Sequence, residues 1–219
     1  MGERGPLEPR GIECRCRISN RASPGARMSA MQHLRDLALG AFFLWIFVDG
    51  AVVFRHRTPK SENRDRLSLL VIAVASPLVW WLAIACAFDS LGLGGAINSR
   101  ALQIAGLSIM AFGILVRSAA IRQLGRLHTP NVALRRDHEL KDGGIYRYVR
   151  HPSYLGALIA LFGFSLALGN WWSVAAIATV APCIYLFRIR EEEAALSAGL
   201  GAAYRDYCAR TKRLIPWIY

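Results

Sequence analysis

The feature that most constrains the fold is a pair of long stretches without any charged side chain. Residues 67–88 form one of them, and a helix of this length can cross a hydrocarbon core of about 30 Å. The second extends from Ser153 to Phe187, which is enough for two short crossings joined by a turn. Gly169-Asn170 is the natural place for that turn, because glycine and asparagine favour turns. The two stretches therefore predict three helices in a lipid bilayer.

Two weaker segments complete a predicted set of five membrane-spanning helices. Residues 37–54 contain one charge, Asp49, and residues 101–121 contain Arg117 near their end. Since a carboxylate in hydrocarbon is costly unless it faces protein or water, we expect Asp49 at the headgroup level near Arg55. The chain is 54% hydrophobic and only 19% charged, which is more apolar than ordinary soluble domains. We therefore predict an all-α integral membrane protein with about five transmembrane helices.

The distribution of basic residues predicts how these helices are oriented. A net charge of +12 could indicate nucleic-acid binding, but in a membrane protein basic connections mark the cytoplasmic side. Residues 55–66, 122–150 and the tail after Phe187 are rich in Lys and Arg, whereas residues 89–100 contain a single Arg. We therefore expect the C-terminus on the cytoplasmic side, membrane lipids as partners and no nucleic acid.

The N-terminal segment conflicts with this topology. Residues 1–27 are rich in arginine and would also prefer the cytoplasmic side, although five crossings place them opposite. One hypothesis is that translation begins at Met28 or Met31. The Pro, Gly and Arg content of the segment suggests disorder in either case. This predicts a disordered and possibly non-native leader (1–30), three transmembrane helices (31–124) and a C-terminal catalytic region (125–219).

Neither a metal site nor a glycine-rich nucleotide loop is predicted. The five cysteines are scattered, and no Cys/His spacing resembles a metal site, so we expect free thiols and no metal. The segment Gly92-Leu93-Gly94-Gly95 lacks the next glycine of a nucleotide-binding turn, because Ile97 occupies its place. We interpret it as a flexible loop on the side opposite the cytoplasm, so any cofactor must bind elsewhere.

Polar residues are densest in residues 128–154, beside the predicted hairpin. Within this stretch Gly143-Gly144 permits a tight turn, and Pro152 suits the first position of a helix. A His-Pro-Ser-Tyr helix entrance places free backbone N–H groups at the mouth of the hairpin, which suits a carboxylate or a ribose. The alternative is a charged loop that only anchors lipid headgroups.

The end of the second hairpin helix is the expected opposite wall of this site. Arg188 and Glu192 are four residues apart and share a helical face, and the hairpin should return this face to His151 and Tyr154. The alternative is a solvated collar of charges at the end of a span. Beyond it, the spacing of Leu and Tyr in residues 194–209 predicts one amphipathic interfacial helix, or equally a packing helix, that roofs the site.

Three blocks of sequence make the prediction more specific. They are HELKDGGIYRYVRHPSYLG at 138–156, REEE at 190–193 and GAAYRDYCARTKRLIP at 201–216. In this order they resemble the C-terminal blocks of the isoprenylcysteine carboxyl methyltransferase family. The resemblance covers about residues 125–219, and the first three predicted helices share only their hydrophobic character with the family. It implies a membrane enzyme that uses S-adenosyl-L-methionine, with cofactor-binding flanks and an active site on the cytoplasmic side.

The resemblance also implies roles for individual residues. Arg188 would be the catalytic residue that binds the substrate carboxylate. The cofactor-binding turn is more charged than is usual for the family, because Lys141 replaces a small apolar residue between Glu139 and Asp142. S-adenosyl-L-methionine would be surrounded by His138, Leu140, Lys141, Tyr146, His151, Pro152, Ser153, Tyr154 and Glu192.

These residue types suit the methylation of a carboxylate. An ionised carboxylate is already a nucleophile, so the reaction needs alignment and a dry site and no general base. Arg188 can hold the carboxylate by two hydrogen bonds, and Glu192 can accept from the ribose or the amino group of the cofactor. We therefore predict carboxyl O-methylation of an isoprenylcysteine-like or other lipidic or prenylated acid that enters from the bilayer.

Three other functions remain open from the sequence alone. One is N-methylation of a phospholipid. Another is an NADPH enzyme similar to sterol reductases, whose closing segment resembles YRDYCARTKRLIPWIY at 204–219. The third is a membrane scaffold without catalytic activity.

Overall fold

All the long elements of the chain are helices. The structure, a computed structural model, describes residues 24–55, 66–125 and 140–215. Within these ranges the backbone forms two isolated β-bridges and no strand longer than that. This confirms the predicted all-α class. The elements are α1 (Pro24–Arg55), α2 (Arg66–Ala87), α3 (Arg100–Leu124), the short 3-10 helix η2 (Gly144–Arg147), α4 (Pro152–Ala167), α5 (Trp171–Leu200) and α6 (Ala202–Arg210).

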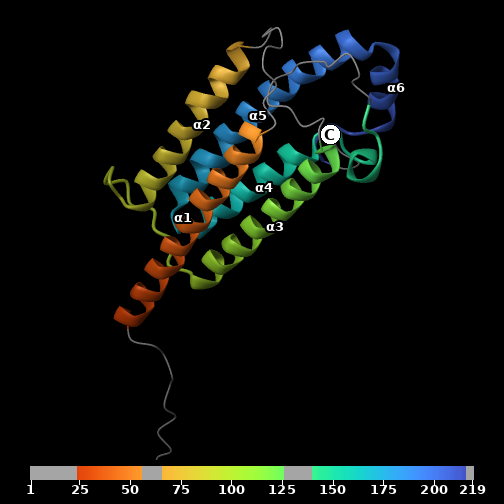
Figure 1. Cartoon of the computed structure of the whole chain (residues 1–219). Helices are drawn as coiled ribbons and strands as arrows, with labels where there is room; N and C mark the ends of the chain where they lie inside the picture. Colours follow the sequence, from red (N-terminus) through yellow and green to blue (C-terminus); the bar gives the residue numbers. More distant parts are fainter. Residues whose placement is uncertain (1–23, 56–65, 126–139, 216–219) are drawn as a thin grey trace, which may run out of the picture.

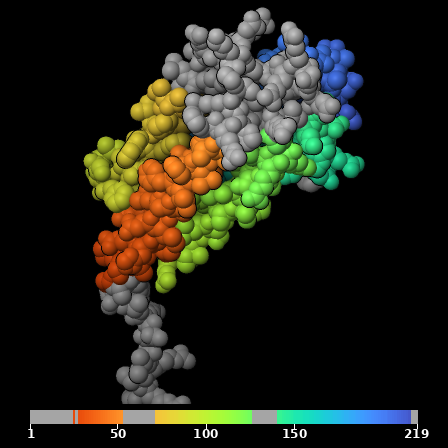
Figure 2. Space-filling model, in the orientation of Figure 1, coloured from red at the N-terminus to blue at the C-terminus, as the bar shows by residue number. Residues whose placement is uncertain are grey.

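Helices α1 to α5 lie side by side in one bundle, and α5 continues past it to α6 (Figure 1). Helix α3 packs most extensively against α4, α2 packs against α5, and α1 contacts both α3 and α4. Large apolar side chains remain exposed on the outer faces of α1, α2 and α3, three helices that lie on one face in Figure 2. Such faces suit a hydrocarbon solvent. They include Phe43, Leu44, Phe47, Trp81, Phe112 and Leu115.

Two helices in the described ranges are long and apolar enough to cross a membrane, as judged by length and composition. They are α3 and α5, while Val71–Ala87 and Pro152–Ala167 are shorter apolar helices. A helix thus lies at each of the five predicted places. That all five cross the bilayer remains a prediction.

The α4–α5 hairpin forms where the sequence predicts it. Pro152 is the first residue of α4. Proline is tolerated there because an N–H at this position would have no hydrogen-bond partner within the helix. Gly169 has a φ of +73°, a left-handed conformation that glycine adopts without strain. The Asn170 side chain then caps α5 by accepting from the backbone N–H of Trp172 at 2.8 Å. The hairpin therefore returns α5 to the end of the bundle at which α4 begins.

The Gly92–Gly95 segment packs against this hairpin turn. The carbonyl of Gly94 accepts from the Asn170 side chain at 2.9 Å, and the Ile97 N–H donates to the carbonyl of Gly169 at 2.7 Å. The segment joins two helices, as predicted, but these hydrogen bonds tie it to the turn. It contributes to the end of the bundle that we call the far end, opposite the start of α4.

Helices α3 and α4 approach each other through four glycines. Gly106 and Gly113 of α3 face Gly163 and Gly156 of α4, and a Cβ at any of the four would collide with the backbone of the partner helix. Small residues at such spacing let two membrane helices pack with their backbones close together. This contact fixes the start of α4 against the end of α3.

Two predicted boundaries differ from the structure. Helix α1 begins at Pro24, so the last part of the predicted leader is helical, while residues 1–23 lie outside the described residues. The single helix predicted over residues 194–209 is wrong. Helix α5 continues to Leu200 and is ended by Gly201, whose φ of +56° starts a separate α6.

Replacing Gly113 by Ala tests the glycine contact. We expect Gly113→Ala to destabilise the protein by about 1–3 kcal/mol, because the added methyl group has no space against the α4 backbone. Gly40→Ala is the matched control, since a Cβ at Gly40 would meet no atom within 4 Å and alanine favours helix. Thermal unfolding in detergent checks this. Equal melting temperatures for the two variants would contradict the close α3–α4 packing.

Candidate active site

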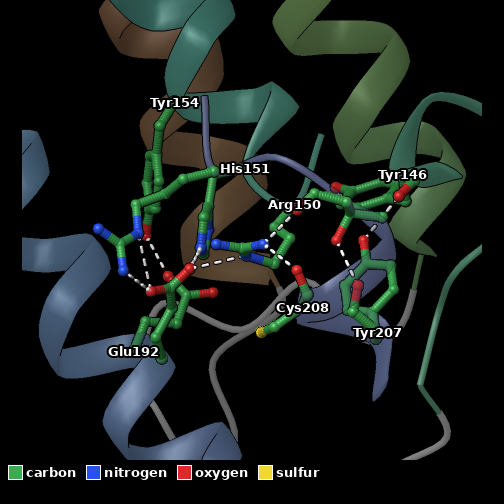
Figure 3. Close-up of polar contacts among 10 residues, drawn as sticks. Tyr146, Arg150, His151, Tyr154, Glu192, Tyr207 and Cys208 are labelled. Atoms are coloured by element: carbon green, nitrogen blue, oxygen red, sulfur yellow. Dashed lines mark hydrogen bonds and ion pairs between the residues drawn. The ribbon is translucent and has the colours of Figure 1, made fainter. Parts of the chain in front are cut away.

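The candidate site lies where α4 begins and α5 leaves the bundle. The Tyr154 hydroxyl donates a hydrogen bond of 2.7 Å to Oε2 of Glu192. The His151 ring stacks beside the Tyr154 ring, with centroids 5.7 Å apart. Figure 3 shows these three side chains converging from the α4 entrance and from α5. The prediction that the hairpin brings the α5 face to His151 and Tyr154 is confirmed.

Arg188 lies one turn before Glu192 on α5. Only 3% of its surface is exposed, and its guanidinium is close enough to the Tyr154 hydroxyl to hydrogen-bond it. Since a guanidinium has five N–H donors in a planar fork, Arg188 can contact Tyr154 and also bind a carboxylate. Tyr154 therefore lies between a cation and an anion that share one face of α5.

The carboxylate of Glu193 joins three segments at this end of the bundle. It accepts from Arg150 Nε at 2.9 Å and from Arg213 Nη2 at 2.7 Å, and it lies 3.3 Å from His151 Nε2. Burial alone would raise the pKa of Glu193, but the hydrogen bonds from His151, Arg213 and Arg150 lower it to about 2. Glu193 lies beyond the uncharged part of α5, which ends at Phe187, and is ionised at neutral pH.

The tail after α6 runs beside the α4 entrance. The backbone N–H groups of Arg150 and His151 donate to the carbonyls of Lys212 and Arg213 at 2.8 and 3.2 Å. The Arg150 side chain also donates to the carbonyls of Cys208 and Thr211. Arg150 thus connects the entrance to both α5 and the tail.

The N-terminus of α4 has no side-chain cap in the described part of the chain. His151 is the capping residue, and its side chain makes no capping hydrogen bond, because its ring points to Glu193 instead. In this first turn Pro152 has no N–H and the Tyr154 N–H already donates to the His151 carbonyl at 3.1 Å, so the turn offers the Ser153 N–H and the partial positive charge of the helix end. This helix end therefore remains suited to a carboxylate or another anion.

The Tyr146 side chain packs away from this cluster. Its hydroxyl donates to the carbonyl of Ala120 at 3.2 Å, and its own carbonyl accepts from the Tyr207 hydroxyl at 2.7 Å. Figure 3 shows Tyr146 and Tyr207 together, across Arg150 from Tyr154. Burial raises the pKa of both tyrosines above the ordinary value, so both hydroxyls stay protonated donors. Tyr146 connects η2 to α3 and α6.

The remaining predicted cofactor residues differ in their exposure. Leu140 is half-buried and Lys141 is exposed, while His138 lies outside the described residues. The predicted tight turn after them is confirmed, because Gly144 has a φ of +61°. There the Gln123 side chain accepts from the Ile145 N–H at 3.0 Å, which ties the turn to the end of α3.

Asp49 has a partner that the sequence analysis missed. Its two carboxylate oxygens accept from Arg117 Nε and Nη2, each at 2.7 Å. The side chain of Arg55 lies outside the described residues, so the expected position of Asp49 near Arg55 stays a prediction. Nη1 of Arg117 also donates to the carbonyl of Ser153 at 3.2 Å. Each charge interrupts an otherwise uncharged segment, and either alone would be costly in lipid. Because each charge alone would be costly in lipid, the sequence could have indicated that Asp49 pairs with Arg117.

The described residues include no group of three or more His, Cys, Asp or Glu side chains placed to hold a metal ion. Cys86, Cys183 and Cys208 are free thiols, which confirms that prediction for these three. The site therefore consists of arginine, glutamate, histidine and tyrosine side chains around one helix entrance.

Comparison with known proteins identifies relatives of the region that contains this site. Residues 105–198 match the model of the isoprenylcysteine carboxyl methyltransferase (ICMT) family. The protein-S-isoprenylcysteine O-methyltransferase of Schizosaccharomyces pombe is 37% identical over 118 residues, which cover 53% of this chain and 50% of that protein. Protein-S-isoprenylcysteine O-methyltransferase B of Arabidopsis thaliana is 35% identical over 115 residues, which cover 52% of this chain and 58% of that protein.

A solved structure supports the same relationship. The eukaryotic intramembrane Ras methyltransferase ICMT matches with a TM-score of 0.55 and 26% identity, over 70% of this chain and 54% of that one. This chain thus spans about half the length of the relatives that it matches. The predicted family resemblance is confirmed.

The low pKa of Glu193 predicts an acid-sensitive part of the stability. The carboxylate stabilises the fold fully above its ordinary pKa of 4.5, and this contribution is lost as the pH falls toward about 2. We expect Glu193→Gln to cost about 1.5–3 kcal/mol at pH 7, since hydrogen bonds to a charged group are lost. The melting temperature of the variant should also fall less between pH 5 and pH 3 than that of the wild type.

Glu191→Gln is the matched control, because Glu191 is exposed on the same helix. Its melting temperature should follow the wild-type pH profile. Parallel profiles for Glu193→Gln and the wild type would contradict the assigned role of the Glu193 carboxylate.

Proposed function

Residues 105–198 of this chain belong to the isoprenylcysteine carboxyl methyltransferase family, and we propose that the chain methylates a carboxylate with S-adenosyl-L-methionine. The observation that carries this proposal is the Tyr154–Glu192 hydrogen bond beside buried Arg188. It puts an anion-binding group and a hydrogen-bond acceptor on one face of α5, at the mouth of the hairpin. The first can hold the acceptor carboxylate, and the second can hold a polar group of the cofactor.

The proposed acceptor is an S-isoprenylcysteine or a similar lipidic acid. The relatives are named for O-methylation of protein S-isoprenylcysteine, and a prenyl chain is an apolar group that partitions into a bilayer. The outer faces of α1 to α3 expose large apolar side chains, so the acceptor can approach through lipid. Its carboxylate would then reach Arg188 at the end of the bundle.

The residues around the α4 entrance fit the proposed cofactor. S-adenosyl-L-methionine supplies, when bound, a methyl group on a positively charged sulfur, and it also carries a carboxylate, an ammonium and ribose hydroxyls. The uncapped N-terminus of α4 suits the carboxylate, and Glu192 suits the ammonium or a hydroxyl. In the proposal the other members of the cofactor-binding set are His138, Leu140, Lys141, His151, Pro152, Ser153 and Tyr154. Tyr146 belongs to the predicted set as well, although its side chain donates to the Ala120 carbonyl on α3.

The proposed roles divide between Arg188 and Glu192. Arg188 aligns the acceptor carboxylate by two parallel hydrogen bonds, so that an oxygen faces the methyl group. The new oxygen–carbon bond forms as the carbon–sulfur bond breaks, and the negative charge of the carboxylate and the positive charge of the sulfonium disappear together. No proton moves, so the described site needs no general base.

We further propose that the site faces the cytoplasm. The residues near it include Arg147, Arg150, Arg210 and Arg213, whereas the connection 89–100 at the far end contains one Arg. Basic residues concentrate on the cytoplasmic side of membrane proteins. The solved relative is an intramembrane enzyme by its description, which supports a membrane setting.

Two substitutions test the division of roles. Glu192→Ala should weaken the binding of S-adenosylhomocysteine about 10- to 100-fold, since a charge-assisted hydrogen bond contributes about 1.5–3 kcal/mol. Arg188→Ala should leave this affinity within about threefold and lower kcat/KM for an S-prenylated acid about 10²- to 10³-fold. Calorimetric titration of the purified protein and a radiolabelled methyl-transfer assay measure the two quantities.

Arg190→Ala is the control, because Arg190 is exposed on the same helix, and it should change neither quantity. Equal losses of cofactor affinity in Arg188→Ala and Glu192→Ala would contradict the division of roles. A wild-type protein that is thermally stabilised by NADPH and not by S-adenosylhomocysteine would overturn the methyltransferase proposal itself.

A further inference from the structure

The far end of the bundle contains a cavity with a mixed polar and apolar lining, away from the candidate active site. Its volume is about 220 Å³, which gives room for more than a few water molecules. It lies between the start of α1, the end of α2, the start of α3 and the α4–α5 turn. Its lining combines polar and apolar side chains, among them Met28, Met31, Arg35, Ile97, Gln103 and Leu168.

Gln103 lines this cavity and keeps one hydrogen-bond acceptor without a partner in the described residues. It is only 3% exposed, and its Nε2 lies 3.4 Å from two carbonyls, those of Met31 and Ala167. Since carbonyls can only accept, these neighbours fix which side of the amide is the N–H₂ group. The opposite atom, Oε1, is buried and has no hydrogen-bond partner in the described residues. A ligand here must therefore offer a donor.

Arg35 lines the same cavity and keeps one hydrogen-bond donor without a partner in the described residues. Its Nη1 donates to the carbonyl of Ala87 at 3.0 Å, and its guanidinium lies 4.2 Å from the centroid of the Phe88 ring. These contacts hold the guanidinium in place. Its Nε is buried and has no hydrogen-bond partner in the ranges that the structure describes. The positive charge of the Arg35 guanidinium therefore favours an anionic ligand.

A small ligand that carries both an anionic group and an N–H donor can satisfy Arg35 Nε and Gln103 Oε1 together. A phosphoethanolamine headgroup does this, because its phosphate accepts from an arginine and its primary ammonium donates to an amide oxygen. A phosphocholine headgroup has the same phosphate but no N–H donor. The apolar members of the lining, such as Met28, Met31 and Leu168, suit the start of the acyl chains.

We propose that the Arg35–Gln103 cavity binds the headgroup of a phosphatidylethanolamine-type lipid in the leaflet at the far end of the bundle. The site is separate from methyl transfer, because it lies at the end of α4 opposite to Tyr154. The bound lipid would connect α1, α2 and α3 to the hairpin turn, so it acts on stability rather than as a methyl acceptor.

Thermal unfolding in mixed micelles tests the proposal. Phosphatidylethanolamine and phosphatidylcholine with identical acyl chains are each added to the purified full-length protein. The ethanolamine lipid should raise Tm by roughly 5 °C more than the choline lipid when it is in about hundredfold excess over its Kd. This difference should vanish in Gln103→Met and shrink in Arg35→Lys, which keeps the charge but changes the donor geometry.

Arg100→Met is the matched control, since Arg100 is exposed at the same end of the bundle and should keep the full difference. Equal shifts with the two lipids would overturn the proposal and indicate a cavity filled by water. An equal shift with free phosphoethanolamine would overturn the lipid as the source. Native mass spectrometry of the wild type, which should retain ethanolamine lipid in preference to choline lipid, decides the matter even where a variant fails to fold.

Discussion

The carboxylate of Glu193 holds together three parts of the chain that are distant in sequence. Arg150 and His151 come from the loop before α4, Glu193 from the end of α5, and Arg213 from the tail after α6. Two of these donors carry a permanent charge, and the carboxylate that they share is largely shielded from water. The position of the α4 entrance relative to α5 depends on this contact, and so does the Tyr154–Glu192 hydrogen bond beside it.

A second constraint comes from the bilayer that the apolar helices require. Glycines bring α3 and α4 close together, and Asp49 of α1 forms an ion pair with Arg117 of α3, so each of these two charges has a partner within the apolar bundle. Arg117 also holds the carbonyl of Ser153, one residue before Tyr154. The polar site therefore sits at the end of an apolar bundle. An acceptor with an apolar chain and an acidic end matches that boundary.

Local sequence signals predicted most of the backbone. Uncharged stretches marked the helices, Pro152 marked the start of α4, and Gly169-Asn170 marked the hairpin turn, because each acts through its own conformational preference. The approach of Glu192 to Tyr154 also followed from the sequence, since a hairpin must return α5 to the start of α4. The end of α5 at Gly201 had a recognisable signal too, a glycine in a helical pattern, but the regular spacing of leucines and tyrosines concealed it.

Long-range contacts could not be predicted in the same way. Asp49 and Arg117 are 68 positions apart, and no local preference indicates which charge meets which. The ion pairs of Glu193 with Arg150 and Arg213 were not predicted either, because they join three segments that only the packing of the tail against α4 and α5 brings together. The unsatisfied amide oxygen of Gln103 likewise depends on the packing of three separate segments.

The most direct measurement is the product formed from a matched pair of acceptors. The purified protein, with S-adenosyl-L-methionine labelled in the methyl group, is offered an S-prenylated N-acetylcysteine and, separately, its carboxamide. The account predicts a labelled, base-labile methyl ester from the acid and no transfer to the amide, because only a carboxylate can be held by Arg188 and act as the nucleophile. Label in a base-stable product, or equal transfer to the acid and the amide, would contradict it.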